Sequence, residues 1–119
     1  EGATPPRLVA PGPDLLATVV REVERLELDG PGQVAVVAPR SLGPALAAAL
    51  DTVAETADIF GARRIVLDPR RAKGLEFDSV VVVDPAAIAG SGPSGRRDLY
   101  VSLTRTTDRL TVVGSLPDP

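Results

Sequence analysis

The chain has 119 residues, 44% hydrophobic and 24% charged, which suffices for one hydrophobic core and is too short for two. It contains no cysteine and no histidine, and this excludes disulfides, thiol nucleophiles, histidine acid–base catalysis and the usual zinc sites. A net charge of −3, with one Tyr, two Phe and no Trp, predicts weak nucleic-acid binding by this piece alone.

The sequence predicts neither a membrane-spanning segment nor a secretory signal. No apolar run approaches the roughly 20 residues that span a bilayer. Residues 1–6 show no basic stretch followed by an apolar one, so we expect no secretory signal. We therefore expect a cytoplasmic protein without membrane contact. No linker divides the chain, and we expect a single domain over residues 1–119.

The first half of the chain begins with a short strand at 8–10 framed by prolines. Asp14 is then expected to cap a helix that runs to about Leu28. On this helix apolar residues recur at three- and four-residue spacing, while charged residues fall on the other face. The apolar stripe comprises Leu15, Leu16, Val19, Val20, Val23 and Leu26, and the charged face comprises Arg21, Glu22, Glu24 and Arg25.

A buried strand and a second helix are predicted next. Residues 33–38 form a continuous apolar run that ends at Pro39, as expected of a strand buried on both faces. Ser41 is expected to cap the following helix. Its buried side would hold Leu42, Leu46, Ala49 and Leu50.

The second half of the chain predicts strands at 63–67, 79–83 and 110–113, a flexible loop over 90–95, and a helix over 96–107. Strands that alternate with helices favour an α/β fold with a mostly parallel sheet of about five strands flanked by helices. In such sheets ligands bind at the carboxyl ends of the strands.

Two segments carry the chemistry. Residues 70–78 read R-R-A-K-G-L-E-F-D before the valine strand, and residues 99–105 read L-Y-V-S-L-T-R on the last predicted helix. They resemble motifs V (K-G-L-E-[FW]-D) and VI (Y-V-A-[LIF]-T-R-A) of UvrD/Rep-type superfamily 1 helicases. The resemblance covers roughly residues 63–114 and implies the C-terminal, second RecA-like motor domain, with a three-layer RecA-like fold. The amino-acid sequence of the first segment most resembles the HelD-like branch of this family, whose members act on RNA polymerase.

The resemblance assigns nucleotide-binding roles to three residues. Arg105 would be an arginine finger directed at the γ-phosphate of ATP, since a guanidinium stays charged and contacts phosphate oxygens bidentately. Gly74 would let the backbone pass close to the nucleotide. Glu76 would accept hydrogen bonds from ribose hydroxyls.

Family members also contact single-stranded DNA through a Thr and a His just before the K-G-L-E core. This chain has Asp68 and Arg70 there instead, which departs from the family pattern. Arg70, Arg71 and Lys73 would still contact phosphates nonspecifically. The sequence therefore predicts weak contacts with single-stranded DNA.

Parts of a complete motor are missing from the sequence. There is no G-x-x-x-x-G-K-[ST] loop, no acidic metal-binding segment after a strand and no Q/N-Y-R-S-type motif, so the chain is expected to begin after these. The resemblance places the first two in the first RecA-like domain, the expected partner. ATP and Mg²⁺ are expected to bind in the full-length protein, and the isolated piece is expected to bind neither and to be inactive.

Plainer interpretations and other functions stay open. Arg105 and the basic cluster at 70–73 would be solvated surface, Gly74 a turn residue, and Glu76 and Asp78 surface carboxylates. A second functional hypothesis is a docking module, for example on RNA polymerase. A third is a small α/β domain that binds a nucleotide or phosphate ligand by itself.

Overall fold

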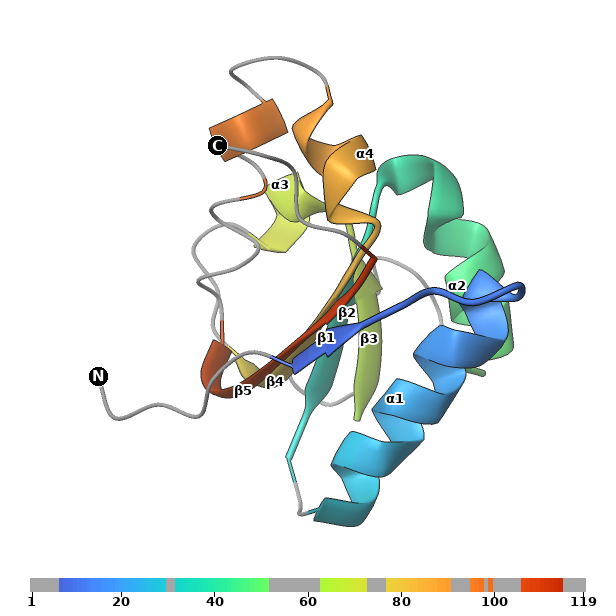
Figure 1. Cartoon of the computed structure of the whole chain (residues 1–119). Helices are drawn as coiled ribbons and strands as arrows, with labels where there is room; N and C mark the ends of the chain where they lie inside the picture. The colour runs from blue at the N-terminus through green and yellow to red at the C-terminus, as the bar shows by residue number, and fades with distance from the viewer. Residues whose placement is uncertain are drawn as a thin grey trace.

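The computed structural model describes residues 7–29, 32–51, 63–72, 77–90, 95–97, 99 and 106–114. Within them, five parallel strands form one sheet in the order β1-β5-β4-β2-β3, with helices on both sides (Figure 1). The strands are β1 (Arg7–Val9), β2 (Val34–Val37), β3 (Arg64–Leu67), β4 (Phe77–Val83) and β5 (Thr106–Val113). The helices are α1 (Leu15–Asp29), the 3-10 helix η1 (Arg40–Leu42), α2 (Gly43–Ala49), α3 (Pro69–Ala72) and α4 (Pro85–Ala89). The predicted three-layer α/β fold is confirmed.

The central strands are buried on both faces, as their valine-rich sequences predict. Every residue of β2 is buried, and so is every residue of β4 except Asp78. Because successive side chains of a strand point to opposite faces, Val34 and Val36 enter one core and Ala35 and Val37 the other. The sheet thus separates two hydrophobic layers.

Helices α1 and α2 cover one face of the sheet (Figure 1). The predicted cap of α1 is confirmed, since the Asp14 carboxylate accepts a hydrogen bond of 3.1 Å from the Ala17 N–H. The apolar stripe of α1 also packs as predicted. The two helices bury Val19, Val23, Leu26, Leu46, Ala47 and Leu50 against the sheet.

The opposite face carries two short helices that the sequence analysis did not predict. α3 and α4 each begin with a proline directly after a strand and its following residue. Proline suits the first turn of a helix because its missing N–H is not needed there. From this layer Ile88 and Leu99 pack against the second core.

Two predictions about the helices are wrong. Ser41 does not cap α2: it lies inside η1, and α2 begins at Gly43 without a side-chain cap, with a proline in its first turn. On α2, Ala49 is exposed and Ala47 is buried instead, because Leu46 and Leu50 fix the buried face and Ala47 lies between them.

Glu22 was expected on the solvent face of α1 but is only 7% exposed. Strand β1 runs beside this helix, and Glu22 accepts hydrogen bonds from Arg7 on β1 and from Arg25 at 2.9 and 3.1 Å. A buried carboxylate is tolerated when such partners satisfy it. Helical periodicity alone therefore misplaced this residue, because its partner comes from another element.

The boundary before the last strand also differs from the prediction. Thr106 and Thr107 were expected to end a helix, but they begin β5, which pairs with β4 from Phe77 onward. β-Branched threonines favour the extended backbone of a strand. Of the predicted loop 90–95, residues 91–94 lie outside the described part, and Gly95 already belongs to a helical segment at 95–97.

Candidate functional site

The strand order creates a crevice at the carboxyl ends of the strands. From β2 the chain continues to β3 on one side, and from β4 it continues to β5 on the other. The point between β2 and β4 is therefore a topological switch point, where open α/β sheets bind ligands. This places the candidate site at the carboxyl edge of the sheet.

A pocket of about 240 Å³ lies at this edge. Its walls come from the residues that follow β2, from those that follow β3, and from α4. They are Pro39, Arg40, Asp68, Pro69, Arg70, Ala87 and Ile88. The pocket thus combines four apolar residues with two guanidinium groups and one carboxylate.

Backbone contacts hold the walls in place. The Asp68 carboxylate accepts a 2.9 Å hydrogen bond from the Arg71 N–H and so fixes the first turn of α3. Asp84 has a left-handed backbone, with φ of 54°, which turns the chain from β4 into α4. Its carbonyl accepts hydrogen bonds from the N–H groups of Ala87 and Ile88 at 3.1 and 3.3 Å. Both short helices are therefore anchored directly to strand ends.

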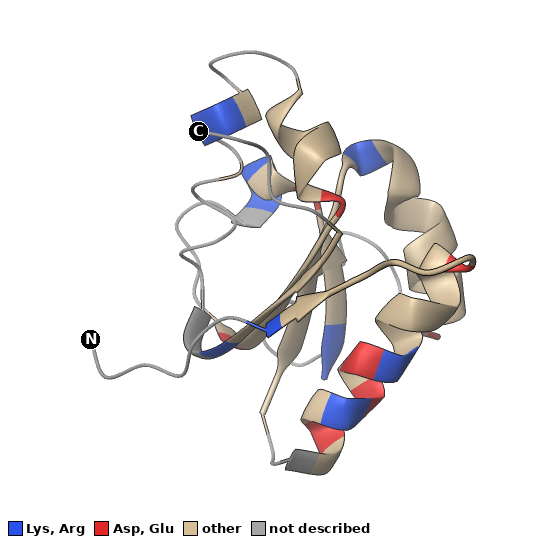
Figure 2. Cartoon of the chain, in the orientation of Figure 1, with Lys and Arg blue, Asp and Glu red and all other residues tan. Residues whose placement is uncertain are grey.

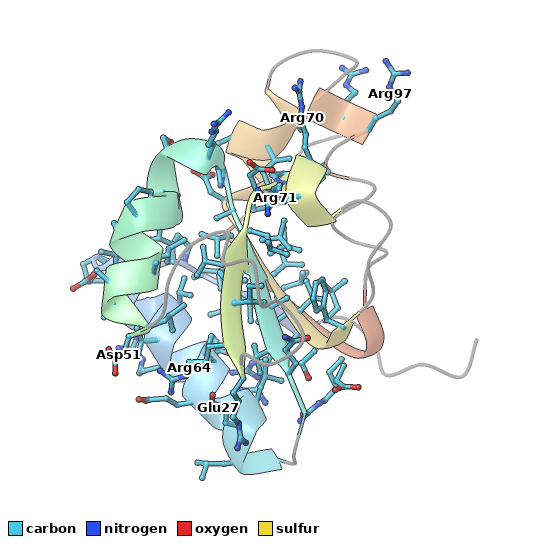
Figure 3. The ribbon with its side chains drawn as sticks, turned by 180° about the vertical axis from the view of Figure 1, so that it is seen from behind. Glu27, Asp51, Arg64, Arg70, Arg71 and Arg97 are labelled. Carbon is cyan, nitrogen blue, oxygen red and sulfur yellow. The ribbon has the colours of Figure 1, made fainter. Side chains whose placement is uncertain are left out.

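Arginines gather at the same end of the molecule. Figure 3 shows Arg70, Arg71 and Arg97 there, whereas Figure 2 shows that α1 carries acidic residues interspersed with arginines. We define the basic rim as the exposed residues Arg40, Arg70, Arg71, Arg96 and Arg97. The net charge of −3 hides this concentration, because composition does not reveal how charge is distributed over the surface.

The sequence-predicted site residues fall into two groups. Arg70 and Arg71 lie on α3 with exposed side chains, at the carboxyl end of β3. The remaining predicted residues, Lys73, Gly74, Glu76 and Arg105, lie outside the described residues. Both described members of the set therefore belong to the basic rim and lie at or beside the pocket.

Arg40 was missed by the sequence analysis. It lies on η1 and reaches the pocket because β2 ends beside β3. A signal was present, since Arg40 follows the buried apolar run at 33–38 by only two residues. In a parallel sheet, a charged residue at that position lies at the ligand-binding edge.

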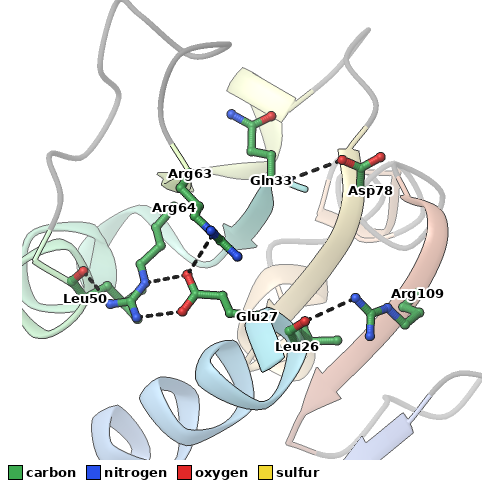
Figure 4. Close-up of polar contacts among 8 residues, drawn as sticks. All are labelled: Leu26, Glu27, Gln33, Leu50, Arg63, Arg64, Asp78 and Arg109. Atoms are coloured by element: carbon green, nitrogen blue, oxygen red, sulfur yellow. Dashed lines mark hydrogen bonds and ion pairs between the residues drawn. The ribbon is translucent and has the colours of Figure 1, made fainter. Parts of the chain in front are cut away.

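The starts of β4 and β5 form a second feature, at the amino edge of the sheet. Phe77 and Thr106 are register partners there. Asp78 follows with an exposed carboxylate that accepts a 3.2 Å hydrogen bond from the Gln33 N–H (Figure 4), so its plainer interpretation as a surface carboxylate is confirmed. A Cβ at Gly32 would lie 2.6 Å from this carboxylate, and φ there is 119°, so the turn requires glycine.

Other charged clusters stabilise the fold away from the pocket. Arg64 on β3 donates two hydrogen bonds of 2.8 Å to the Glu27 carboxylate and one of 2.9 Å to the Leu50 carbonyl, which ties α1 and α2 to the sheet (Figure 4). The hydrogen bonds from Arg64 hold the pKa of Glu27 below its ordinary value, although partial burial opposes the shift. These groups are structural.

The Glu22 carboxyl group balances two opposing effects. Burial raises its pKa, but the hydrogen bonds from Arg7 and Arg25 outweigh this and lower it overall.

Among the described residues, no group of acidic side chains is arranged to hold a metal ion. None of the described helices has the length and apolar character needed to cross a membrane.

Comparisons with known proteins find similarity to a protein family and to a solved structure. Residues 65–113 match the family model of the UvrD-like helicase C-terminal domain. A similar solved structure is the crystal structure of the C-terminal domain of a possible DNA helicase from Lactobacillus plantarum WCFS1. It is 26% identical with a TM-score of 0.73, and the similarity covers 96% of this chain and 77% of that one. A comparison with curated proteins finds no similar sequence.

Proposed function

Because residues 65–113 match the UvrD-like helicase C-terminal domain and the chain is similar to the solved C-terminal domain of a possible DNA helicase, we propose that it is the second motor domain of an ATP-dependent DNA helicase or translocase. In this role it completes an ATP site that the first RecA-like domain of the same protein begins. The K-G-L-E segment and Arg105 supply the completing groups. The chain by itself does not hydrolyse ATP.

The pairing of Phe77 with Thr106 is the observation that supports this proposal best. Along the sequence, Glu76 directly precedes the first of these residues and Arg105 directly precedes the second. The two motifs therefore enter the sheet as neighbours at one edge. A ribose ligand and an arginine finger must come from one rim if they are to serve the same nucleotide.

Each residue has a distinct task in the proposed site. Arg105 stabilises the negative charge that develops on the γ-phosphoryl group, an effect worth about 10³–10⁵ in rate for such fingers. Glu76 accepts hydrogen bonds from the ribose, and Gly74 keeps side-chain atoms away from the nucleotide. Mg²⁺ would be held by the first domain, where the family resemblance places the acidic metal-binding segment. When bound, it would neutralise phosphate charge.

The basic rim is the proposed contact with single-stranded DNA. Arg70 and Arg71 of the rim, together with Lys73, are the residues that the sequence analysis selected for phosphate contacts. The rim lies at the carboxyl edge, whereas the motif neighbours Phe77 and Thr106 lie at the amino edge. The nucleotide and the nucleic acid would thus bind at different edges of one sheet. Closure of the two domains around ATP would then change the contacts of this domain with single-stranded DNA.

The arginine finger is tested in the full-length protein by Arg105→Ala. We expect ATP turnover to fall about a thousandfold or more, while the circular dichroism spectrum stays native. Arg105→Lys should recover little of the rate, because lysine cannot make the bidentate contact. The matched control is Arg21→Ala, which removes an exposed arginine on α1 and should leave turnover unchanged. Normal turnover in Arg105→Ala would refute the finger assignment.

Two further measurements separate the other hypotheses. Calorimetry of the isolated chain with ATP should detect no binding, or millimolar binding at most, whereas a self-sufficient nucleotide-binding domain would bind tightly. The HelD-like placement and RNA polymerase as a partner stay predictions. A pull-down with the full-length protein, comparing RNA polymerase with single-stranded DNA, tests them.

A further inference from the structure

We infer that Asp78 is a positioning residue for the proposed nucleotide site. Its carboxylate holds the start of β4 against the segment before β2 and thereby sets the direction in which the chain leaves the sheet toward Glu76. This inference rests on the proposed function, which assigns ribose binding to Glu76. It adds a residue that the sequence analysis interpreted only as a surface carboxylate, and it states which kinetic quantity that residue controls.

The contacts of Asp78 form what we call the Asp78 clasp, which consists of its carboxylate, Gly32 and Gln33. The Gln33 N–H donates a 3.2 Å hydrogen bond to Oδ2 of Asp78 (Figure 4), and the Gln33 carbonyl accepts one of 3.3 Å from the Ser79 N–H. The carboxylate lies so close to Gly32 that a Cβ there would be 2.6 Å from Oδ2. The start of β4 and the segment before β2 are therefore fitted to each other by specific contacts.

The Asp78 clasp acts where regular strand pairing is interrupted. The ladder between β2 and β4 begins with the pair Val34–Ser79, one residue after Asp78. On the other side of β4, the ladder with β5 shifts register between Phe77 and Ser79, that is, at Asp78. Such irregularities disrupt the ladder locally and are frequent next to active sites, where they redirect a side chain. The clasp thus holds β4 at the residue where the regular ladders do not.

Two neighbouring residues then fix the exit of the chain toward Glu76. Phe77 is 2% exposed and is anchored in the core on the side of α3 and α4. Asp78 is the one residue of β4 that is not buried, and the clasp ties it to the start of β2. A single anchor fixes a position, whereas two adjacent anchors also fix the direction of the chain. Because Glu76 is bonded directly to Phe77, loss of the clasp should change the direction in which Glu76 points.

The expected consequence is specific to the ribose. A misplacement of about 1 Å can cost about a hundredfold in rate, so the orientation of a contacting group matters. In the proposed site Glu76 contacts the ribose, whereas Arg105, which precedes β5, contacts the γ-phosphate. We define the ribose preference as kcat/KM for ATP divided by kcat/KM for dideoxy-ATP, which lacks both ribose hydroxyl groups. Phosphate contacts are common to the two substrates and cancel in this ratio.

ATP hydrolysis by the full-length protein tests the inference. The unaltered protein should prefer ATP about tenfold or more, because a hydrogen bond to a charged group contributes at least this factor. Glu76→Ala should lower the ribose preference to about one, and Asp78→Ala should lower it about three- to tenfold, as expected for one hydrogen bond. Asp78→Asn should recover most of the preference, because its amide oxygen can accept the Gln33 N–H.

Arg109→Ala is the matched control for a loss of stability. The Arg109 guanidinium donates a hydrogen bond of the same length, 3.2 Å, to the Leu26 carbonyl (Figure 4). Arg109 lies on β5 and is less exposed than Asp78. Its removal should therefore lower stability at least as much as Asp78→Ala while leaving the ribose preference unchanged. Equal losses of ribose preference in the two variants would mean a general loosening of the sheet and would overturn the positioning role.

The two glutamate and aspartate variants separate failure of this inference from failure of the proposed function. If Glu76→Ala lowers the ribose preference and Asp78→Ala does not, the positioning role is wrong and ribose binding by Glu76 stands. If Glu76→Ala leaves the preference unchanged, the ribose assignment itself is wrong, and the inference fails with it. The arginine finger is tested separately, by the turnover of Arg105→Ala.

Hydrogen exchange in the isolated chain tests the Asp78 clasp without any nucleotide. The Gln33 amide should exchange about fivefold faster in Asp78→Ala than in the unaltered chain, because its hydrogen bond to the carboxylate is lost. In Arg109→Ala the exchange of this amide should change less. An unchanged exchange rate in Asp78→Ala would show that the clasp does not hold the Gln33 N–H in solution, and the inference would be wrong.

Discussion

The two faces of the sheet are built differently. One face is covered by α1 and α2, helices of 15 and 7 residues, and its core is rich in Leu and Val from both the helices and the strands. The described helices on the other face, α3 and α4, have only 4 and 5 residues, yet they supply walls of the pocket. Both faces bury aliphatic side chains, but only the second combines its core with pocket walls supplied by short helices that follow strand ends. Stability and recognition are therefore largely assigned to opposite faces.

The largest loss of stability is expected when a side chain in the core of the first face, under α1 and α2, is truncated. Leu46→Ala removes a fully buried side chain of α2 and should lower the free energy of unfolding by about 2–5 kcal/mol. Ile88→Ala, on the pocket side, should cost less, because solvent in the pocket can fill the space that the side chain leaves. Urea denaturation of both variants gives the comparison. A larger loss for Ile88→Ala would show that the pocket face carries the stability.

A medium effect is expected for the ionic tie between α1, α2 and β3. Arg64, whose side chain is 26% exposed, donates two hydrogen bonds to Glu27 and one to the Leu50 carbonyl. Glu27→Ala removes the first two and keeps the third. Losing a charge-assisted pair of this kind should cost about 1–3 kcal/mol. Glu24→Ala is the control, since it removes an exposed glutamate from the same helix and should stay within about 0.5 kcal/mol. Equal effects in denaturant titrations would mean that the pair contributes nothing specific.

The same face should also determine the response to acid. The pKa values of Glu22 and Glu27 are lowered in the folded state, so near the ordinary glutamate pKa the unfolded chain binds more protons. Their contribution is thus present above that pKa and is lost as the pH falls through the lowered values. Denaturant titrations along a pH series should show stability falling on acidification, and Glu27→Ala should flatten this dependence. An unchanged slope in the variant would contradict the assignment.

The stable face was also the more predictable one. The stripe of α1 followed from helical periodicity, the strand β2 from its continuous apolar run, and the cap at Asp14 from the residue type at the start of the helix. The burial of Glu22 could not be predicted in this way, because its partner Arg7 belongs to another element. α3 and α4 were missed because a helix of one turn has no periodicity to detect.

The site was predictable only where a motif marked it. Residues 73–76 and Arg105 were chosen by resemblance to a family, and their roles stay predictions. Arg40 and Ile88 carry no motif, and they meet Asp68 only because β2, β3 and β4 end side by side. Strand order is a non-local property, and a single sequence gives little information about it. Knowing the fold was therefore necessary to find the pocket.

Substitutions in the basic rim are expected to have the smallest effect on stability. Their effect on DNA binding tests whether the rim contacts nucleic acid. Arg97 is exposed at the end of the molecule where Arg70 lies (Figure 3). Arg97→Ala should change the free energy of unfolding by no more than about 0.5 kcal/mol. If Arg97 contacts one phosphate, the plot of log affinity for single-stranded DNA against log salt should become shallower by about 0.7. Arg21→Ala removes the same charge from α1 and should leave this slope unchanged, because α1 lies on the stabilising face. Equal changes of slope in the two variants would mean that only net charge matters, and that recognition is not confined to the rim.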